Sequence, residues 1–290
     1  MATNLLKSKT PKVYKNKKLN SADFDNYNLN EYQVFLHLVT KLGKVDELGR
    51  YTQSDELKRE HCLSAKEFAT MFDIPLNKAY GVIKQACKKL MKTSVILEKP
   101  ELFETWEINV CSSAQYKHNE GKIIIRFTDD IMPYLAQVNK KFVLYNLKEI
   151  ANFGSLYTTR LYELIQEFKD TGLIVKSIEQ LRNIFAVGKK FSLYSDFKRK
   201  TFGHAVDEIN SQYELNLQFE EVKEGRKVVA IKFTFIPTFI RKSVDPKTGK
   251  EKNIYLKPKV KKSIKNNKKQ ELIKERDKNH DNDNNKTFCN

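Results

Sequence analysis

The stretch FATMFDIPLNKAYGVIK, residues 68–84, decides the fold, because two segments with helical periodicity are separated there by a short break. The break ends in Pro75, and proline disfavours helical conformation in the residue before it. The first helix is predicted to begin at Ser64, since Ser64 and Glu67 have the spacing of a capping box. The stretch therefore predicts a short helix, a tight turn and a longer helix, which together form a helix-turn-helix.

The longer helix has one apolar face and one basic face. The apolar face is predicted to bury Leu76, Ala79, Tyr80, Ile83, Ala86 and Leu90. The opposite face carries Asn77, Lys78, Gly81, Lys84 and Lys88. Two interpretations are open: the basic face enters a DNA groove, or it is an ordinary solvated face. Gly81 costs about 1 kcal/mol of helix stability relative to alanine, so it indicates either close approach of another backbone or a tolerated accident.

The segments around this pair complete a winged helix. Residues 29–42 have helical spacing, and residues 43–62 are polar and irregular, which predicts a loop. Residues 104–113 and 121–130 alternate between apolar and polar side chains and predict a hairpin. Its tip offers Lys117, His118 and Lys122 either for phosphate contacts or simply for solubility.

The same order of elements then recurs. Helical spacing is found in residues 155–168, 177–185 and 194–210, and a strand pair follows at 215–222 and 228–236. Ser177 and Gln180 form a second capping box. One face of the third helix is predicted to consist of Phe197, Thr201, Ala205 and Ile209. The sequence thus predicts an α+β protein with two tandem winged-helix domains.

The second unit supplies its own candidates for DNA contacts. They are Tyr194, Ser195, Lys198, Arg199 and Lys200 on the helix, Lys189 and Lys190 in the preceding turn, and Lys223, Arg226 and Lys227 in the wing. Arg199 is the best candidate for a bidentate contact to guanine, because lysine offers only a point charge. The alternative is a surface ion pair between Arg199 and Asp196.

The net positive charge favours a polyanionic partner, but it is unevenly distributed along the chain. The 290 residues include 53 Lys and Arg and 36 Asp and Glu, a net charge of +17. About half of that charge lies in residues 241–290, which contain 16 basic and 7 acidic side chains. We predict a flexible basic arm (1–18), an N-terminal winged helix (19–145), a C-terminal winged helix (146–240) and a disordered Lys/Asn-rich tail (241–290). The tail either adds phosphate attraction or only improves solubility.

Several other classes of protein are disfavoured. The four cysteines lack CxxC spacing and the histidines are not clustered, which disfavours a structural zinc site and fits a reducing cytoplasmic setting. We expect no metal and no cofactor. No apolar run approaches the roughly eighteen residues of a membrane span. A rolling-circle nickase usually has two histidines separated by one residue, and the five histidines, at 37, 61, 118, 204 and 280, form no such pair. There is also no GxxxxGK[ST] loop, which disfavours intrinsic ATPase activity. We expect a DNA-binding protein without enzymatic activity. The alternative of a transcriptional repressor with a purely regulatory role stays open, because the fold does not decide between the two functions.

The runs SLYTTRLYELIQEF, SIEQLRNIF, YSDFKRKTFGHAVDEIN and EGRKVVAIKF resemble the Rep_3 family of plasmid replication initiators. The resemblance covers about residues 20–237, and its most specific part is Phe197 to Arg199 together with Ala205 to Asn210. It implies that two winged helices bind one directly repeated origin sequence, or iteron, as a monomer, with the helix at 194–200 in a major groove. It also implies a dimer, formed through the N-terminal winged helix, that represses the protein's own promoter. Further implications are opening of AT-rich DNA, recruitment of a host initiator and helicase, and location in a bacterial cytoplasm.

Overall fold

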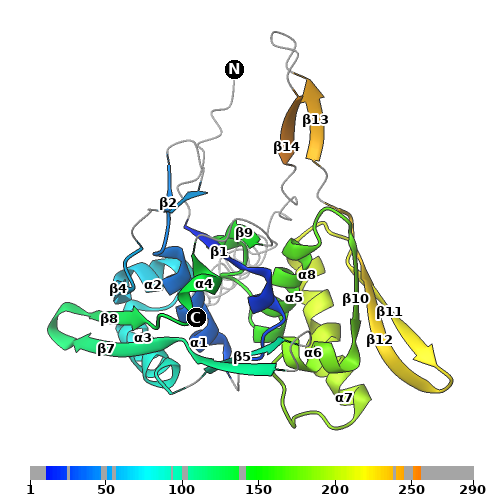
Figure 1. Ribbon diagram of the computed structural model, residues 1–290, viewed down its shortest axis with the longest axis horizontal. Coiled ribbons are helices and arrows are strands. Elements are labelled where there is room, and N and C mark those ends of the chain that lie inside the picture. The colour runs from blue at the N-terminus through cyan, green and yellow to red at the C-terminus, as the bar shows by residue number, and fades with distance from the viewer. Residues whose placement is uncertain are drawn as a thin grey trace, which may run out of the picture.

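Two three-stranded sheets, each accompanied by a helix-turn-helix, confirm the prediction of two winged helices (Figure 1). The computed structural model describes residues 11–24, 27–46, 51–53, 57–92, 94–99, 104–136, 142–237, 240–244 and 251–255. The wing of the first unit lies at the left end of the view in Figure 1 and the wing of the second unit at the right end. The buried apolar side chains of both units belong to one continuous cluster.

The N-terminal unit places its helix-turn-helix against a small antiparallel sheet. Its helices are α1 (Leu29–Thr40), α2 (Ala65–Phe72) and α3 (Leu76–Leu90), and a short α4 (Met132–Leu135) follows the sheet. Its sheet has the order β4-β8-β7, with β4 at Glu60–Ser64, β8 at Lys122–Phe127 and β7 at Cys111–Lys117. The wing is therefore the β7–β8 hairpin, closed by a 3-10 turn at His118–Glu120.

Other strands of this unit differ from the sequence predictions. The predicted strand at 104–113 is divided: β6 (Glu104–Asn109) pairs with β5 (Ser94–Lys99), and only its end belongs to the wing strand β7. The predicted loop at 43–62 contains β2 (Lys44–Val45), β3 (Tyr51–Thr52) and the start of β4. β2 and β3 pair with each other and have only two residues each, which is too short for an alternating pattern. β4 pairs with the distant β8, which local periodicity does not reveal.

The prediction of a flexible arm over residues 1–18 is wrong for residues 12–18. β1 (Lys12–Asn16) pairs with β9 (Phe142–Asn146), and a 3-10 turn (Lys17–Asn20) follows. Val13 and Lys15 are fully buried, so the segment is part of the core in spite of its charge. Residues 1–10 lie outside the described residues.

The C-terminal unit follows the predicted order closely. It contains α5 (Leu156–Glu167), β10 (Leu173–Ser177), α6 (Ile178–Ile184), β11 (Gln218–Glu224) and β12 (Lys227–Thr234), with sheet order β10-β12-β11. A 3-10 turn at Leu147–Glu149 precedes α5. The sequence analysis did not predict β10, which is a short edge strand.

One long helix of this unit is continuous but not uniform. It consists of α7 (Tyr194–Lys198), the π segment η5 (Arg199–Gly203) and α8 (His204–Gln212). The predicted face of Phe197, Thr201, Ala205 and Ile209 is fully buried, which confirms the prediction. The wider π turn accommodates this repeat of four residues, since an ideal α-helix has 3.6 residues per turn.

The predicted disorder of residues 241–290 is wrong for part of that range. β13 (Ile240–Val244) and β14 (Glu251–Tyr255) form an antiparallel hairpin. Such a hairpin requires only local pairing, which a high content of lysine and asparagine does not forbid. Residues 245–250 and 256–290 lie outside the described residues. Within the part of the chain that the structure describes, no helix has the length and apolar character needed to cross a membrane.

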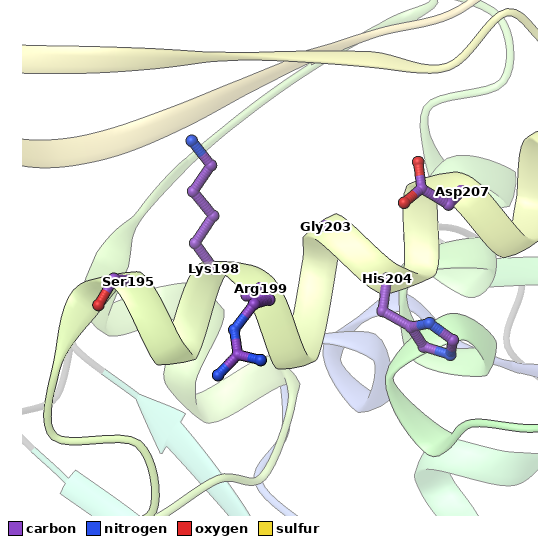
Figure 2. A pocket seen from close by; sticks show the side chains of 6 residues that line it. All are labelled: Ser195, Lys198, Arg199, Gly203, His204 and Asp207. Atoms are coloured by element: carbon purple, nitrogen blue, oxygen red, sulfur yellow. The ribbon is translucent and has the colours of Figure 1, made fainter.

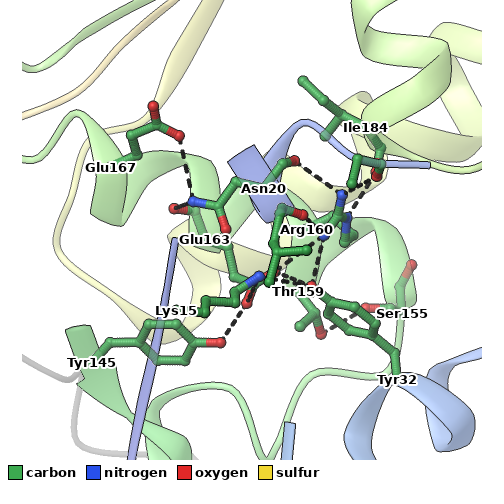
Figure 3. A network of polar contacts seen from close by, with 12 residues as sticks. Lys15, Asn20, Tyr32, Tyr145, Ser155, Thr159, Arg160, Glu163, Glu167 and Ile184 are labelled. Carbon is green, nitrogen blue, oxygen red and sulfur yellow. Dashed lines mark hydrogen bonds and ion pairs between the residues drawn. The ribbon is translucent and has the colours of Figure 1, made fainter. Parts of the chain in front are cut away.

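A network of buried, charged and polar side chains around α5 connects the two units (Figure 3). Arg160 donates hydrogen bonds to the carbonyls of Leu19 (3.1 Å), Asn20 (2.9 Å) and Ala22 (2.7 Å) before α1, and to the carbonyl of Ile184 (2.8 Å) at the end of α6. One guanidinium group thus contacts both winged helices. This network fixes how the two winged helices are placed relative to each other.

A buried carboxylate balances this charge. Glu163 accepts hydrogen bonds from the hydroxyls of Tyr32 and Tyr145, both at 2.5 Å, and pairs with Lys15 at 2.9 Å. Burial alone would raise the pKa of Glu163, but Lys15 and Arg160 outweigh it and lower that pKa below its ordinary value. The carboxylate is therefore ionised, and α5 carries a fully paired buried ion cluster.

Candidate nucleic-acid interface

The outer side of the helix at 194–212 forms a shallow hollow of about 480 Å³ (Figure 2). Its lining residues come from successive turns of that helix: Ser195, Lys198, Arg199, Gly203, His204 and Asp207. Three of them, Ser195, Lys198 and Arg199, are candidates from the sequence analysis. The buried face described above holds this stripe outward, so a groove of DNA can approach it without rearrangement of the core.

Arg199 is both paired and exposed. Its guanidinium donates to a carboxylate oxygen of Asp196 at 2.6 Å, while 72% of its side chain is open to solvent. Lys200 lies 3.7 Å from the same carboxylate. The hydrogen bond from Arg199, followed by the charge of Lys200, lowers the pKa of Asp196. The ion pair considered in the sequence analysis is thus present, and the exposed guanidinium can still exchange Asp196 for another acceptor.

The turn before this helix presents Lys189 and Lys190, which are both exposed. Arg182 of α6 supports the turn by donating to the carbonyls of Lys190 (3.1 Å) and Phe191 (2.5 Å). Its guanidinium also lies 4.8 Å from the ring centroid of Phe197. Phe191 has a φ of 56°, a left-handed conformation that non-glycine residues rarely adopt. Local sequence does not indicate this role of Arg182, because these contacts depend on tertiary structure.

The second wing is connected to the helix through Glu221 of β11. One carboxylate oxygen of Glu221 accepts hydrogen bonds from the Tyr194 hydroxyl (2.8 Å) and from Lys198 Nζ (2.9 Å). These two donors lower the pKa of Glu221 to about 2, so the carboxylate is ionised at neutral pH. Lys223 lies 3.4 Å from the other oxygen. Local sequence does not indicate this role of Glu221, because its partners Tyr194 and Lys198 are more than twenty residues away in the chain.

The remaining wing candidates lie at the tip of the β11–β12 hairpin. Arg226 and Lys227 are exposed and follow Gly225, whose φ of 60° suits the tight turn. Lys223 is also exposed, on the strand that leads to the tip. The hairpin therefore carries three cations beyond the end of the buried sheet face.

In the N-terminal unit, α3 presents the predicted basic face. Asn77, Lys78, Gly81 and Lys88 are exposed, and Lys84 is half-buried. Apart from the backbone of its own helical turns and its two chain neighbours, no atom of the described residues lies within 4 Å of a Cβ placed on Gly81, so packing within the chain does not require a glycine there. The space over Gly81 is open to an external partner.

Two details of this helix-turn-helix differ from the predictions. Leu76, predicted to be buried, is 59% exposed because it is the first residue of α3, where the apolar face has not yet reached the core. Ser64 is the N-cap of α2 but makes no side-chain capping bond. Ser64 also ends β4, where it pairs with Lys122. Glu67 instead binds Lys41, so the predicted capping box is absent.

The first wing is also connected to its helix by a tyrosine. The Tyr80 hydroxyl of α3 lies 2.9 Å from Nδ1 of His118, and the His118 ring stacks on Tyr116. Lys117 and Lys122 pair with Glu120 at 3.6 and 3.0 Å, and the hydrogen bond from Lys122 is the main cause of the lowered pKa of Glu120. In both units, therefore, a tyrosine of the second helix is hydrogen-bonded to the wing.

Two helix-turn-helix units with basic outer faces and connected wings define a tandem winged-helix protein of the DNA-binding class. Residues 12–166 match the family described as "Initiator Replication protein, WH1", and residues 177–235 match "Initiator Rep protein, WH2". The chain therefore belongs to the family of initiator replication proteins, which confirms the resemblance. The first match includes α5, and the predicted domain boundary after residue 145 stays a prediction.

Two proteins of Escherichia coli are similar in sequence to this chain. A "Replication initiation protein" of Escherichia coli is 30% identical over 190 residues, which cover 63% of this chain and 56% of the relative. The "PI protein" of Escherichia coli is 24% identical over 208 residues, covering 60% of this chain and 68% of that protein. The chain thus spans little more than half the length of the first of these relatives.

A solved structure has the same fold. The crystal structure of the Pi initiator protein in complex with iteron DNA has a TM-score of 0.63 and 22% sequence identity. The similarity covers 79% of this chain and 98% of that chain.

Proposed function

We propose that this protein initiates plasmid replication by binding directly repeated origin sequences, or iterons, through its two winged helices. The observation that carries the proposal is the arrangement of basic side chains in a chain of this family. Both units expose them on the second helix of the helix-turn-helix and at the wing. Proteins that read double-stranded DNA place such a helix in the major groove and contact the backbone around it.

In the C-terminal unit, the contacts divide into two kinds. Lys189 and Lys190 in the turn before the helix, and the cations of the wing, are exposed and suit phosphate contacts. Ser195 and Arg199 lie on the outer face of the helix and suit base edges. Arginine can bind O6 and N7 of one guanine with two hydrogen bonds, so Arg199 is the main candidate for sequence reading.

The N-terminal unit completes the site in this proposal. Asn77, Lys78, Lys84 and Lys88 of α3 face the DNA, and Gly81 lets the helix backbone approach it closely. Wing residues Lys117 and Lys122 add phosphate contacts, with their present partner Glu120 competing for them. We propose no chemical step on the DNA, because the protein acts by binding.

The later events are also part of the proposal and rest on the family. Monomers bound to the repeats open neighbouring AT-rich DNA and recruit the host initiator and helicase. A dimer, formed through the N-terminal winged helix, binds an inverted repeat at the protein's own promoter and represses it.

A footprint of the purified protein on the DNA around its own coding region tests the proposal, with excess random DNA as competitor. We expect protection of several evenly spaced direct repeats. Protection of one inverted repeat alone would instead indicate a repressor. Absence of protection would indicate that the basic faces are ordinary solvated surface and do not bind a specific DNA sequence.

A further inference from the structure

Glu221 is an acidic residue placed within the basic surface of the second unit. It lies on β11 of the wing and contacts Tyr194 and Lys198, the first and last residues of α7. Figure 2 shows the Lys198 side chain extending away from Arg199, toward the neighbouring strands. The Lys198 ammonium also lies 5.4 Å from the ring centroid of Phe219 on the same strand. Lys198 thus contacts two residues of the wing strand β11, Phe219 and Glu221.

The partners of Glu221 differ in kind from those of Asp196. Asp196 belongs to the same helical turn as Arg199 and Lys200, so its ion pairs are local and move with the helix. Glu221 lies more than twenty residues away from Lys198 in sequence and joins two separate elements. Its side chain is only 21% exposed, which makes its ion pair less screened by water than the pairs of Asp196.

We infer that Glu221 is a specificity-determining residue, which lowers affinity for non-cognate DNA by keeping Lys198 from the phosphates of that DNA. This inference rests on the proposed function. Affinity for random DNA comes almost entirely from phosphate neutralisation, so each cation held by a carboxylate weakens it. On cognate DNA, base contacts fix the helix and the Lys198 pair with Glu221 is retained. The carboxylate therefore penalises the wrong partner more than the right one.

The experiment compares Glu221→Gln with a matched control, Glu220→Gln. Glu220 is the preceding residue of β11, points to the other face of the sheet, and pairs with Lys232 at 3.1 Å. Both substitutions remove one negative charge from the same strand. Binding is measured by fluorescence anisotropy on a random-sequence duplex at 50 to 200 mM salt, and on a duplex carrying the sequence protected in the footprint.

We expect Glu221→Gln to bind the random duplex more tightly than Glu220→Gln, by about threefold at the lowest salt. The slope of log affinity against log salt should be steeper by about 0.9, the value for one additional phosphate contact. Affinity for the protected sequence should change less, so the ratio of specific to random binding falls. Equal slopes and equal ratios for the two variants would overturn the role of Glu221.

A second variant tests the cause and guards against a folding defect. In a Lys198→Gln background, Glu221→Gln should lose most of its effect on the salt slope, since the released cation is absent. An undiminished effect would overturn the assignment to Lys198. If the wild-type protein binds both duplexes equally, the proposed function fails, and this result is separate from any difference between the Glu221 and Glu220 variants.

Discussion

Arg160 of α5 donates a hydrogen bond to the hydroxyl of Tyr32 on α1 at 2.7 Å, across 128 residues of sequence. The guanidinium carbon also lies 5.2 Å from the ring centroid of Tyr32, and both side chains are fully buried. Tyr32 in turn donates to Glu163. A charged cluster of this kind has strict geometry, so it fixes the orientation of α1 relative to α5 more closely than apolar packing alone.

Replacement of Arg160 by leucine should therefore destabilise the protein strongly. The change leaves the carbonyls of Leu19, Asn20 and Ala22 without a donor and weakens the balance of Glu163. Breaking a buried pair in this way costs about 3 to 5 kcal/mol. Urea unfolding measures the loss, with Arg226→Leu as the exposed control. A cost below about 1 kcal/mol would show that Arg160 does not hold the junction.

The buried His37 of α1 predicts a pH dependence of stability. Its side chain is almost fully buried among Phe68 and Phe72, and neither ring nitrogen has a hydrogen-bond partner among the described residues. Burial, assisted by the positive charge of Lys41 and opposed by Glu67, lowers the pKa of His37 to about 4. The unfolded chain binds this proton near pH 6.5, so between those values the unfolded state holds more protons.

The stability that the neutral, buried His37 contributes is thus fully present above about pH 6.5. It is lost as the pH falls toward 4, which lowers the free energy of unfolding by up to about 3 kcal/mol. His37→Phe should flatten the fall in unfolding free energy over that window. His204→Gln, at a side chain that is 55% exposed, serves as the control for the loss of a histidine outside the core. If His37→Phe has the same slope as the wild type, His37 is not the group that titrates.

On the DNA side, Arg199→Ala tests base reading. If the guanidinium leaves Asp196 to bind a guanine, the variant should lose about 1 to 3 kcal/mol of specific affinity and much less on random DNA. Competition binding on protected and random duplexes measures both values. Arg226→Ala is the control for a cation that contacts only phosphate, and it should weaken both duplexes alike. An equal loss for Arg199→Ala would refute its role in sequence reading.

Gly81→Ala should separate stability from binding. A methyl group at Gly81 meets no described atom outside its own helical turns, so alanine should stabilise α3 by about 0.5 to 1 kcal/mol. If α3 enters a groove with its backbone close to DNA, the same substitution should reduce affinity. Thermal unfolding and anisotropy measure the two effects, and Gln85→Ala, on an exposed position of the same helix, is the control. Higher stability with unchanged affinity would place Gly81 outside the interface.

The two predicted capping boxes explain what local sequence can and cannot predict. At Ser177, the side chain accepts from the backbone of Gln180 and the Gln180 side chain accepts from the backbone of Ser177, as the spacing predicts. At Ser64, the same pattern is overridden because the residue also belongs to β4 and Glu67 binds Lys41. Local signals predict where helices begin, but pairing with distant elements decides which side chains are available.

In the candidate site too, local sequence predicts some features, and others depend on packing against distant elements. Helical periodicity predicts which face of residues 194–210 is buried, and hence that Ser195 and Arg199 are exposed. It does not predict the support of the turn by Arg182 or the contact of Lys198 with Glu221, because these depend on how α6 and β11 pack against the helix. The π segment is likewise invisible to a pattern based on 3.6 residues per turn.

Alanine substitution of Ser177 and of Ser64 tests whether only the Ser177 side chain caps its helix. Ser177→Ala should cost about 1 kcal/mol of unfolding free energy, because it removes the acceptor for the backbone of Gln180 at the start of α6. Ser64→Ala should cost only a few tenths, since the Ser64 side chain makes no capping bond. Urea unfolding of both variants under the same conditions compares them directly. Equal costs would mean that Ser64 does cap α2 in solution, and that the pairing of β4 does not displace the capping box.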